Sequence, residues 1–86
     1  MNVWKETKVE KKSSVPILDR RETGFRIAQL REQKGFSVVE LQKIFGFKTP
    51  QMIYNWQNGT NVPNAQQLLI LTYLFGVSIE DIIRTK

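Results

Sequence analysis

Apolar residues recur at a spacing of three to four through most of the chain after residue 21, a period typical of amphipathic helices. Together with the turn residues that interrupt it, this period predicts five short helices: about 22–34, 38–45, 50–58, 64–75 and a last one after Ser78. Connections of two to six residues favour a compact all-α domain. Residues 1–21 lack the period and are rich in polar residues. We expect them to form a flexible basic N-terminal arm before a domain of residues 22–86. The exception is the short apolar patch of residues 15–18, for which folding back onto the domain or onto a partner is the alternative.

Helix boundaries are marked by residues that start or stop a helix. Ser37 is expected to cap the second helix, and Glu40 three residues later completes a capping box. Thr49 is expected to cap the third, with Pro50 at its first position, where a missing N–H does no harm. The remaining expected caps and left-handed stops are Asn64, Ser78 with Asp81, Gly35, Gly46 and Gly76.

Each predicted helix has an apolar side for the core. In the third helix Ile53 and Trp56 lie three apart, so we expect Trp56 in the core rather than exposed and stacked on a bound partner. Met52 is expected to be buried, with contact to a bound partner as the alternative. The inward residues expected of the other helices are Phe25, Ile27, Ala28 and Leu30; Leu41, Ile44 and Phe45; Leu68, Leu71, Leu74 and Phe75; and Ile79, Ile82 and Ile83.

Residues 37–64 have the layout of a helix-turn-helix motif. A helix of about eight residues is followed by a turn of three to four residues that contains Gly46, and then by a short helix ending at Asn58-Gly59. The second helix of this motif enters the DNA major groove. The layout therefore points to DNA as the partner.

Spaced sequence pieces carry a wider similarity: Arg26-Ile27, Leu30-Arg31, residues 34–37, Glu40-Leu41, Gly46-Phe47, residues 53–59, Pro63, Leu68, Leu71 and residues 76–83. On these pieces the chain, from about Gly24 to Ile83, resembles the Cro/lambda-repressor (XRE-type) DNA-binding domain of bacterial and phage regulators. The string of residues 46–56 is similar to a Gram-positive variant with one extra residue in the turn. The resemblance implies a five-helix lambda-repressor-like domain that binds double-stranded DNA.

Composition excludes several kinds of chemistry. The 86 residues include no cysteine and no histidine, which removes disulfides, thiol and imidazole catalysis and the usual zinc sites. Glu80 and Asp81 open a helix, where capping explains them without catalysis. No enzyme, cofactor, metal or small-molecule ligand is expected. No apolar run reaches the ~18–20 residues that a membrane span needs, so we expect a cytoplasmic, nucleoid-associated protein with no membrane partner.

The net charge of +5 favours a polyanionic partner, but the charges are unevenly placed. Residues 1–21 hold six Lys or Arg against three acids, whereas residues 22–86 hold seven against five. No charged residue lies between Lys48 and Glu80. Recognition helices of the family commonly carry Arg or Lys, and this one carries amides, Thr and Tyr instead.

The resemblance places base reading on the third helix. Gln51 and Asn55 match the two positions most often used, and either amide can donate to and accept from adenine; solvated polar residues are the alternative. Pro50 occupies a third contact position and offers only apolar contact, for example to a thymine methyl group. Tyr54 is expected to reach a phosphate or sugar through its hydroxyl.

Contacts with the DNA sugar-phosphate backbone are expected at the two ends of the third helix. Lys48 and Thr49 form one group, and the other comprises Asn58, Thr60, Asn61 and Asn64 in the following loop, where the family commonly has Lys or Arg. Arg20 and Arg21 are solvated charges by default, with phosphate contact as the alternative if the arm lies along the duplex.

The chain departs from the family pattern at three further positions, Gln57, Val38 and Gln42. In the family, the arginine at the position of Arg31 pairs with an acid where this chain has Gln57, whose amide can still accept a hydrogen bond from guanidinium. The chain departs from the family at Val38, where a phosphate-contacting Gln is usual, and at Gln42, where a small Ala is usual.

These patterns favour a sequence-specific, double-stranded DNA-binding transcriptional regulator, a repressor, that reads the major groove with residues of about 50–58. The alternative is a protein-interaction module on the same fold, such as an antitoxin-like or phage accessory subunit, and the uncharged stretch 49–79 favours it. The resemblance also implies a homodimer on DNA. The residues show no dedicated dimerisation segment beyond 15–18 and the C-terminal helix.

Overall fold

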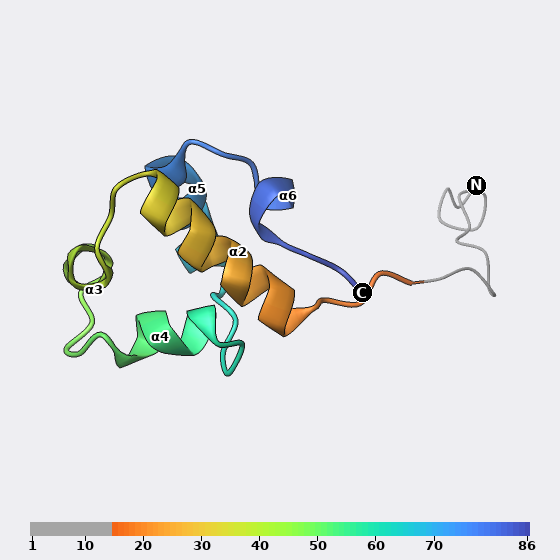
Figure 1. Cartoon of the computed structure of the whole chain (residues 1–86), viewed down its shortest axis with the longest axis horizontal. Helices are drawn as coiled ribbons and strands as arrows, with labels where there is room; N and C mark the ends of the chain where they lie inside the picture. The colour runs from red at the N-terminus through yellow and green to blue at the C-terminus, as the bar shows by residue number, and fades with distance from the viewer. Residues whose placement is uncertain (1–14) are drawn as a thin grey trace, which may run out of the picture.

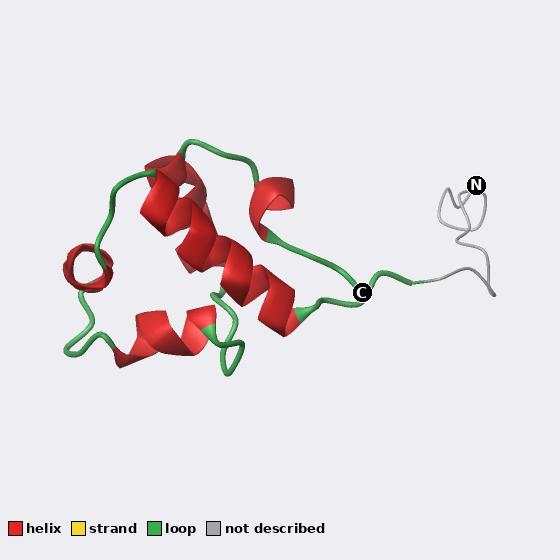
Figure 2. Ribbon diagram, in the orientation of Figure 1, coloured by secondary structure: helices red, strands yellow, loops and turns green. Residues whose placement is uncertain are grey.

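The computed structural model describes residues 15–86, which form five helices and no strand longer than an isolated bridge. The helices, shown in Figures 1 and 2, are α2 (Arg20–Gln33), α3 (Val38–Phe45), α4 (Gln51–Gln57), α5 (Ala65–Phe75) and α6 (Ile79–Ile82). The predicted all-α domain of five short helices is confirmed. Most of the predicted arm, residues 1–14, lies outside the described residues.

Helix α2 begins two residues earlier than the sequence pattern suggests. The Asp19 carboxylate caps it by accepting from the Glu22 N–H, and the segment before it is paired with the end of the chain. Leu18 forms an antiparallel bridge with Thr85. On either side of it, the Asp19 N–H donates to the Arg84 carbonyl and the Lys86 N–H to the Ile17 carbonyl, both at 2.8 Å. Figure 1 shows the C-terminus beside the orange segment before α2. Residues 17–19 are therefore joined to the folded domain.

The predicted starts and stops are largely confirmed. In α3 the Ser37 hydroxyl accepts from the Glu40 N–H at 3.0 Å and the Glu40 carboxylate accepts from the Ser37 N–H at 2.7 Å. Asn64 caps α5 as expected, and it also forms a capping box with Gln67 that was not predicted. The expected glycine stops have left-handed backbones: Gly35, Gly46 and Gly76. Helix α4 starts at Gln51, one residue late, so five residues separate it from α3.

One hydrophobic core joins the helices. Its fully buried members are Ile27, Leu30, Leu41, Ile53, Trp56, Leu71, Phe75 and Ile82. Helix α2 packs more extensively against α4 than against any other helix, so α2 sets the position of α4.

Three residues expected in the core are exposed. Phe25 lies two residues before Ile27, which is about 200° around the helix, so the two cannot face the same way. In α3 the inward places go to Leu41 and Phe45, and Ile44 faces out. Ile79 is the first residue of a four-residue helix that turns only Ile82 fully inward.

The capping boxes make stability depend on pH. Hydrogen bonds from the Ser37 backbone N–H, and then from its hydroxyl, hold the pKa of Glu40 below its ordinary value. The corresponding bonds from Ser78 lower the pKa of Asp81. A carboxyl group with a lowered pKa stabilises the fold fully above its unfolded-state pKa, about 4.3 for Glu, and this stabilisation is lost as pH falls through the folded value.

We therefore expect Glu40→Gln to melt at a lower temperature than the wild type at pH 7, with the difference shrinking as pH falls below about 4.3. Thermal unfolding of both proteins across a pH series measures this. A difference that stayed constant down to about pH 3 would show that the ionised carboxylate contributes nothing through the box.

Candidate nucleic-acid interface

Helix α4 is fixed by an aromatic contact on its inner side. Trp56 is 1% exposed, and its ring meets those of Phe45 and Phe47 edge-on at centroid distances of 5.1 and 5.7 Å. Ile53 is fully buried beside it. The expectation that Trp56 belongs to the core is confirmed. Met52 is partly buried against the same cluster.

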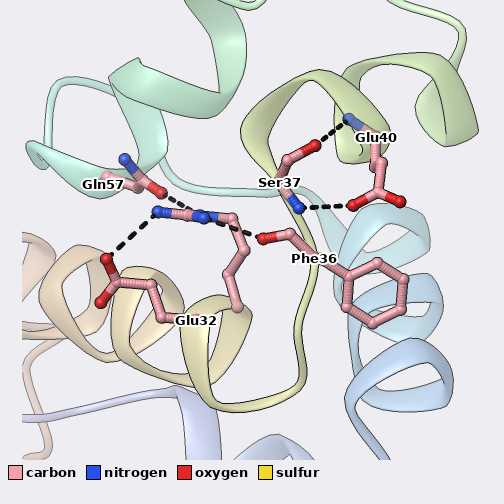
Figure 3. A network of polar contacts seen from close by, with 6 residues as sticks. Glu32, Phe36, Ser37, Glu40 and Gln57 are labelled. Carbon is pink, nitrogen blue, oxygen red and sulfur yellow. Dashed lines mark hydrogen bonds and ion pairs between the residues drawn. The ribbon is translucent and has the colours of Figure 1, made fainter.

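A polar contact ties the end of α4 to α2. The Arg31 Nε donates to the Gln57 side-chain oxygen at 2.8 Å, and Nη1 donates to the Phe36 carbonyl at 2.8 Å. Nη2 lies 3.8 Å from the Glu32 carboxylate. Figure 3 shows the Gln57 side chain pointing toward α2 and Glu32, with the Ser37–Glu40 box nearby. The expected hydrogen bond from the Arg31 guanidinium to the neutral amide of Gln57 is confirmed.

The outward side of α4 carries a coupled pair of amides. Gln51 is exposed and Asn55 half-buried, and the Gln51 Nε2 donates to Asn55 Oδ1 at 2.9 Å. Their spacing of four residues puts them on one face, opposite Ile53. Tyr54, 48% exposed, lies on the solvent side of the same helix. Pro50 is half-buried in the turn before α4. Base reading by these four residues stays a prediction.

The start of α4 presents a cation and a hydroxyl. Lys48 and Thr49 are both exposed, and the Thr49 hydroxyl accepts from the Gln51 N–H at 3.3 Å. The prediction that Thr49 caps this helix with Pro50 at its first position is wrong, because Pro50 itself occupies the N-cap position and the helix begins at Gln51. The amide of Gln42, in α3, donates to the carbonyl of Phe47, in the turn, at 3.2 Å. The larger side chain at 42 is thus accommodated by a bond to the turn.

The loop after α4 uses part of its polar capacity internally. The Asn58 Oδ1 accepts from the Thr60 N–H at 2.9 Å, and the Asn61 N–H donates to the Asn55 carbonyl at 3.1 Å. Asn64 Oδ1 accepts from the Gln67 N–H at 2.8 Å. The four residues of this loop that were predicted to contact the DNA backbone are all exposed: Asn58, Thr60, Asn61 and Asn64. Asn58 and Asn64 each keep an amide NH₂ for a ligand. Their contact with phosphate stays a prediction.

The positioning of α4 depends on one residue that sequence reasoning missed. Gly24 lies in the middle of α2 where a side chain would collide with the carbonyl oxygens of Trp56 and Gln57. A glycine inside a helix-forming stretch was the available signal, since it is unfavourable there unless another backbone approaches closely. Gly24 therefore permits α2 and α4 to pack backbone to backbone.

Two features of other function classes are not found within residues 15–86. No three acidic residues lie close enough together to hold a metal ion. None of the helices is long and apolar enough to cross a membrane.

Comparison with known proteins agrees with this geometry. Residues 27–82 match the sequence model of the helix-turn-helix family. No curated protein matches the chain significantly.

Solved structures show the same fold. The DNA-binding domain of BldD from S. venezulae is 17% identical with a TM-score of 0.62, and the alignment covers 76% of this chain and 96% of that one. The restriction-modification controller protein C.AhdI from Aeromonas hydrophila is 20% identical with a TM-score of 0.64, covering 74% and 96%. Apo-HppE is 23% identical with a TM-score of 0.65, covering 76% of this chain but 36% of that one. The fold therefore also occurs inside a longer chain.

Proposed function

This chain belongs to the XRE-type helix-turn-helix family of DNA-binding regulators, and from that premise we propose that it is a sequence-specific repressor of transcription. Helix α4 enters the major groove of double-stranded DNA and blocks polymerase or another regulator by occupying the site. The proposal includes two copies bound to paired half-sites, and action in the cytoplasm at the nucleoid.

The observation that carries this proposal is the two-sided character of α4. Ile53 and Trp56 hold one side of the helix in the core. On the opposite side, Gln51 and Asn55 form a hydrogen-bonded pair. Lys48 precedes the helix and a polar, uncharged loop follows it. The inner side of such a helix is held in the core, and its outer side can form hydrogen bonds with the edges of DNA bases.

The contact between the two amides limits how each can read a base. One N–H of Gln51 and one lone pair of Asn55 Oδ1 are used within the pair. The Asn55 NH₂, the second lone pair of Oδ1 and the Gln51 carbonyl oxygen remain. Asn55 can therefore still grip adenine at N6 and N7 while Gln51 holds its side chain in place. The two residues should act as a unit.

We expect Gln51→Ala and Asn55→Ala to weaken binding to the preferred duplex by ~1–3 kcal/mol for each bidentate base contact that is lost. Their affinity for scrambled DNA should be almost unchanged. Because the residues share a hydrogen bond, the double variant should lose less than the sum of the two single losses. The measurement is Kd on preferred and scrambled duplexes, the preferred site being found by selection from random DNA. Equal losses on both duplexes would contradict the assignment of α4 as the recognition helix.

Lys48→Ala is the matched comparison because it removes charge from the same helix end without touching the amides. It should weaken both duplexes alike and make the slope of log Kd against log salt shallower by about one unit. A loss confined to the preferred duplex would show that Lys48 reads bases.

The second candidate is a protein-interaction module on the same fold. Besides the uncharged stretch 49–79, exposed apolar side chains on α5 favour it: Leu69 is 56% exposed and Tyr73 85% exposed. A salt titration of binding to random duplex DNA separates the candidates, because phosphate-driven affinity falls steeply with salt. A wild-type protein without measurable affinity for DNA at low salt would favour the module.

A further inference from the structure

The C-terminal end of α4 has no cation of its own. Non-specific affinity for DNA comes from Lys and Arg that neutralise phosphates, yet no residue between Lys48 and Glu80 is charged. Lys48 supplies one cation before the helix begins. The loop of residues 58–61 offers amide and hydroxyl groups only.

The first turn of α2 lies directly against this loop. The Arg20 Nη2 donates to the Thr60 carbonyl at 2.9 Å across 40 positions of sequence. A Cβ atom at Gly59 would lie 3.2 Å from both the Arg20 carbonyl oxygen and the Arg21 Cα, so the two backbones are in close contact. Figure 1 shows the loop after α4 beside the orange start of α2.

The contact fixes the Arg20 side chain and leaves it able to bind an anion. A guanidinium group has five N–H donors in a rigid fork. One of them is used by Thr60, and Arg20 remains exposed. Two acids lie in the same turn, Asp19 and Glu22, and the Asp19 carboxylate caps the helix by accepting from the Glu22 N–H at 3.0 Å. Among the described residues, Arg20 bonds to a carbonyl and to no carboxylate.

We propose that Arg20, positioned by Thr60 and by the close approach of Gly59, binds a DNA backbone phosphate at the C-terminal end of α4. The inference rests on the proposed function and adds a residue to it. Seven residues make α4 about 10 Å long, so Lys48 and Arg20 bracket the recognition helix with one cation at each end. Arg20 thus supplies a positive charge at the C-terminal end of α4, where residues 49–79 contain none.

The test compares three variants by Kd on preferred and scrambled duplexes over a salt series. Arg20→Gln removes the charge, Arg20→Lys keeps it, and Lys34→Gln removes an exposed charge just beyond the other end of α2. Arg20→Gln should weaken both duplexes by about tenfold at about 50 mM salt and by about threefold at about 200 mM, with a salt slope shallower by about one unit. Arg20→Lys should keep the wild-type slope, and Lys34→Gln should change neither slope nor affinity.

The inference would be overturned if Arg20→Gln kept the wild-type salt slope. It would also be overturned if the Kd of Arg20→Gln changed no more than that of Lys34→Gln. A shallower slope for Arg20→Lys as well would also overturn it, because charge would then not be the cause. In each case wild-type binding to DNA leaves the proposed function intact. Loss of all DNA binding by the wild type at low salt would overturn both. Melting curves confirm that each variant is folded at the temperature of measurement.

Discussion

Replacing Trp56 with alanine is expected to lower the free energy of unfolding by about 3–5 kcal/mol, the usual cost of truncating a buried aromatic side chain. The ring is 1% exposed and meets Phe45 and Phe47 edge-on. It therefore joins α4, the end of α3 and the turn between them. Small domains have a total stability of about 5–15 kcal/mol. If this domain lies near the lower end of that range, the variant keeps only about 0–2 kcal/mol and a substantial fraction of it is unfolded near 0.

Urea or thermal unfolding followed by circular dichroism measures this loss. Tyr54→Ala is the control, since Tyr54 lies two positions away on the same helix and is 48% exposed; its loss should be within about 0.5 kcal/mol. Trp56→Phe should fall between the two. It keeps an aromatic ring and removes the buried Nε1, which has no partner among the described residues. Similar melting of Trp56→Ala and the wild type would show that α4 is not held by this ring.

The sequence predicted those parts of the fold whose cause is local. Helix α3 was predicted with its observed bounds because Ser37, Glu40 and Gly46 mark its ends through bonds that span only a few residues. The burial of Ile53 and Trp56 followed from a spacing of three in a short helix. Local chemistry therefore sufficed to find the helix-turn-helix and its buried side.

The sequence could not predict what depends on contacts between distant residues. The pairing of residues 17–19 with the last residues of the chain is such a contact. The start of α2 at Arg20 instead has a local cause that the pattern of apolar residues missed, the cap of Asp19 on the Glu22 N–H. Ile44 and Ile79 are apolar at near-helical spacing, and the packing of neighbouring helices decides that they face solvent. Phe25 is different, because its spacing of two from Ile27 already places it on the other side of α2. The contact between Arg20 and Thr60 spans 40 positions and leaves no trace in the local pattern.

The candidate site divides in the same way. The polar residues of α4 and its flanking loops could be predicted from the motif, and the exposure of Gln51 and Lys48 agrees with that prediction. The hydrogen bond between Gln51 and Asn55 could not, because a spacing of four permits the bond without requiring it. The position of α4 relative to the core depends on a glycine 32 residues before Trp56.

Gly24→Ala should therefore destabilise the domain, although the same change inside an unobstructed helix stabilises it by about 0.5–1 kcal/mol. A Cβ at this position would lie 2.6 Å from the Gln57 carbonyl oxygen and closer still to that of Trp56. Both are backbone atoms at the end of α4, so relief requires α4 to move away from α2. Forcing a group into a packed interface typically costs about 1–3 kcal/mol, which exceeds the gain in helix propensity.

The displacement should also weaken DNA binding. Moving the end of α4 strains the bond between Arg31 and Gln57 and shifts Asn55 relative to Lys48. We expect Gly24→Ala to bind the preferred duplex more weakly at a temperature where it is still folded, while Gln29→Ala, an exposed change on the same helix, alters neither melting nor Kd appreciably. A Gly24→Ala protein that melted above the wild type and bound the preferred duplex with unchanged Kd would show that α2 and α4 do not need this close approach.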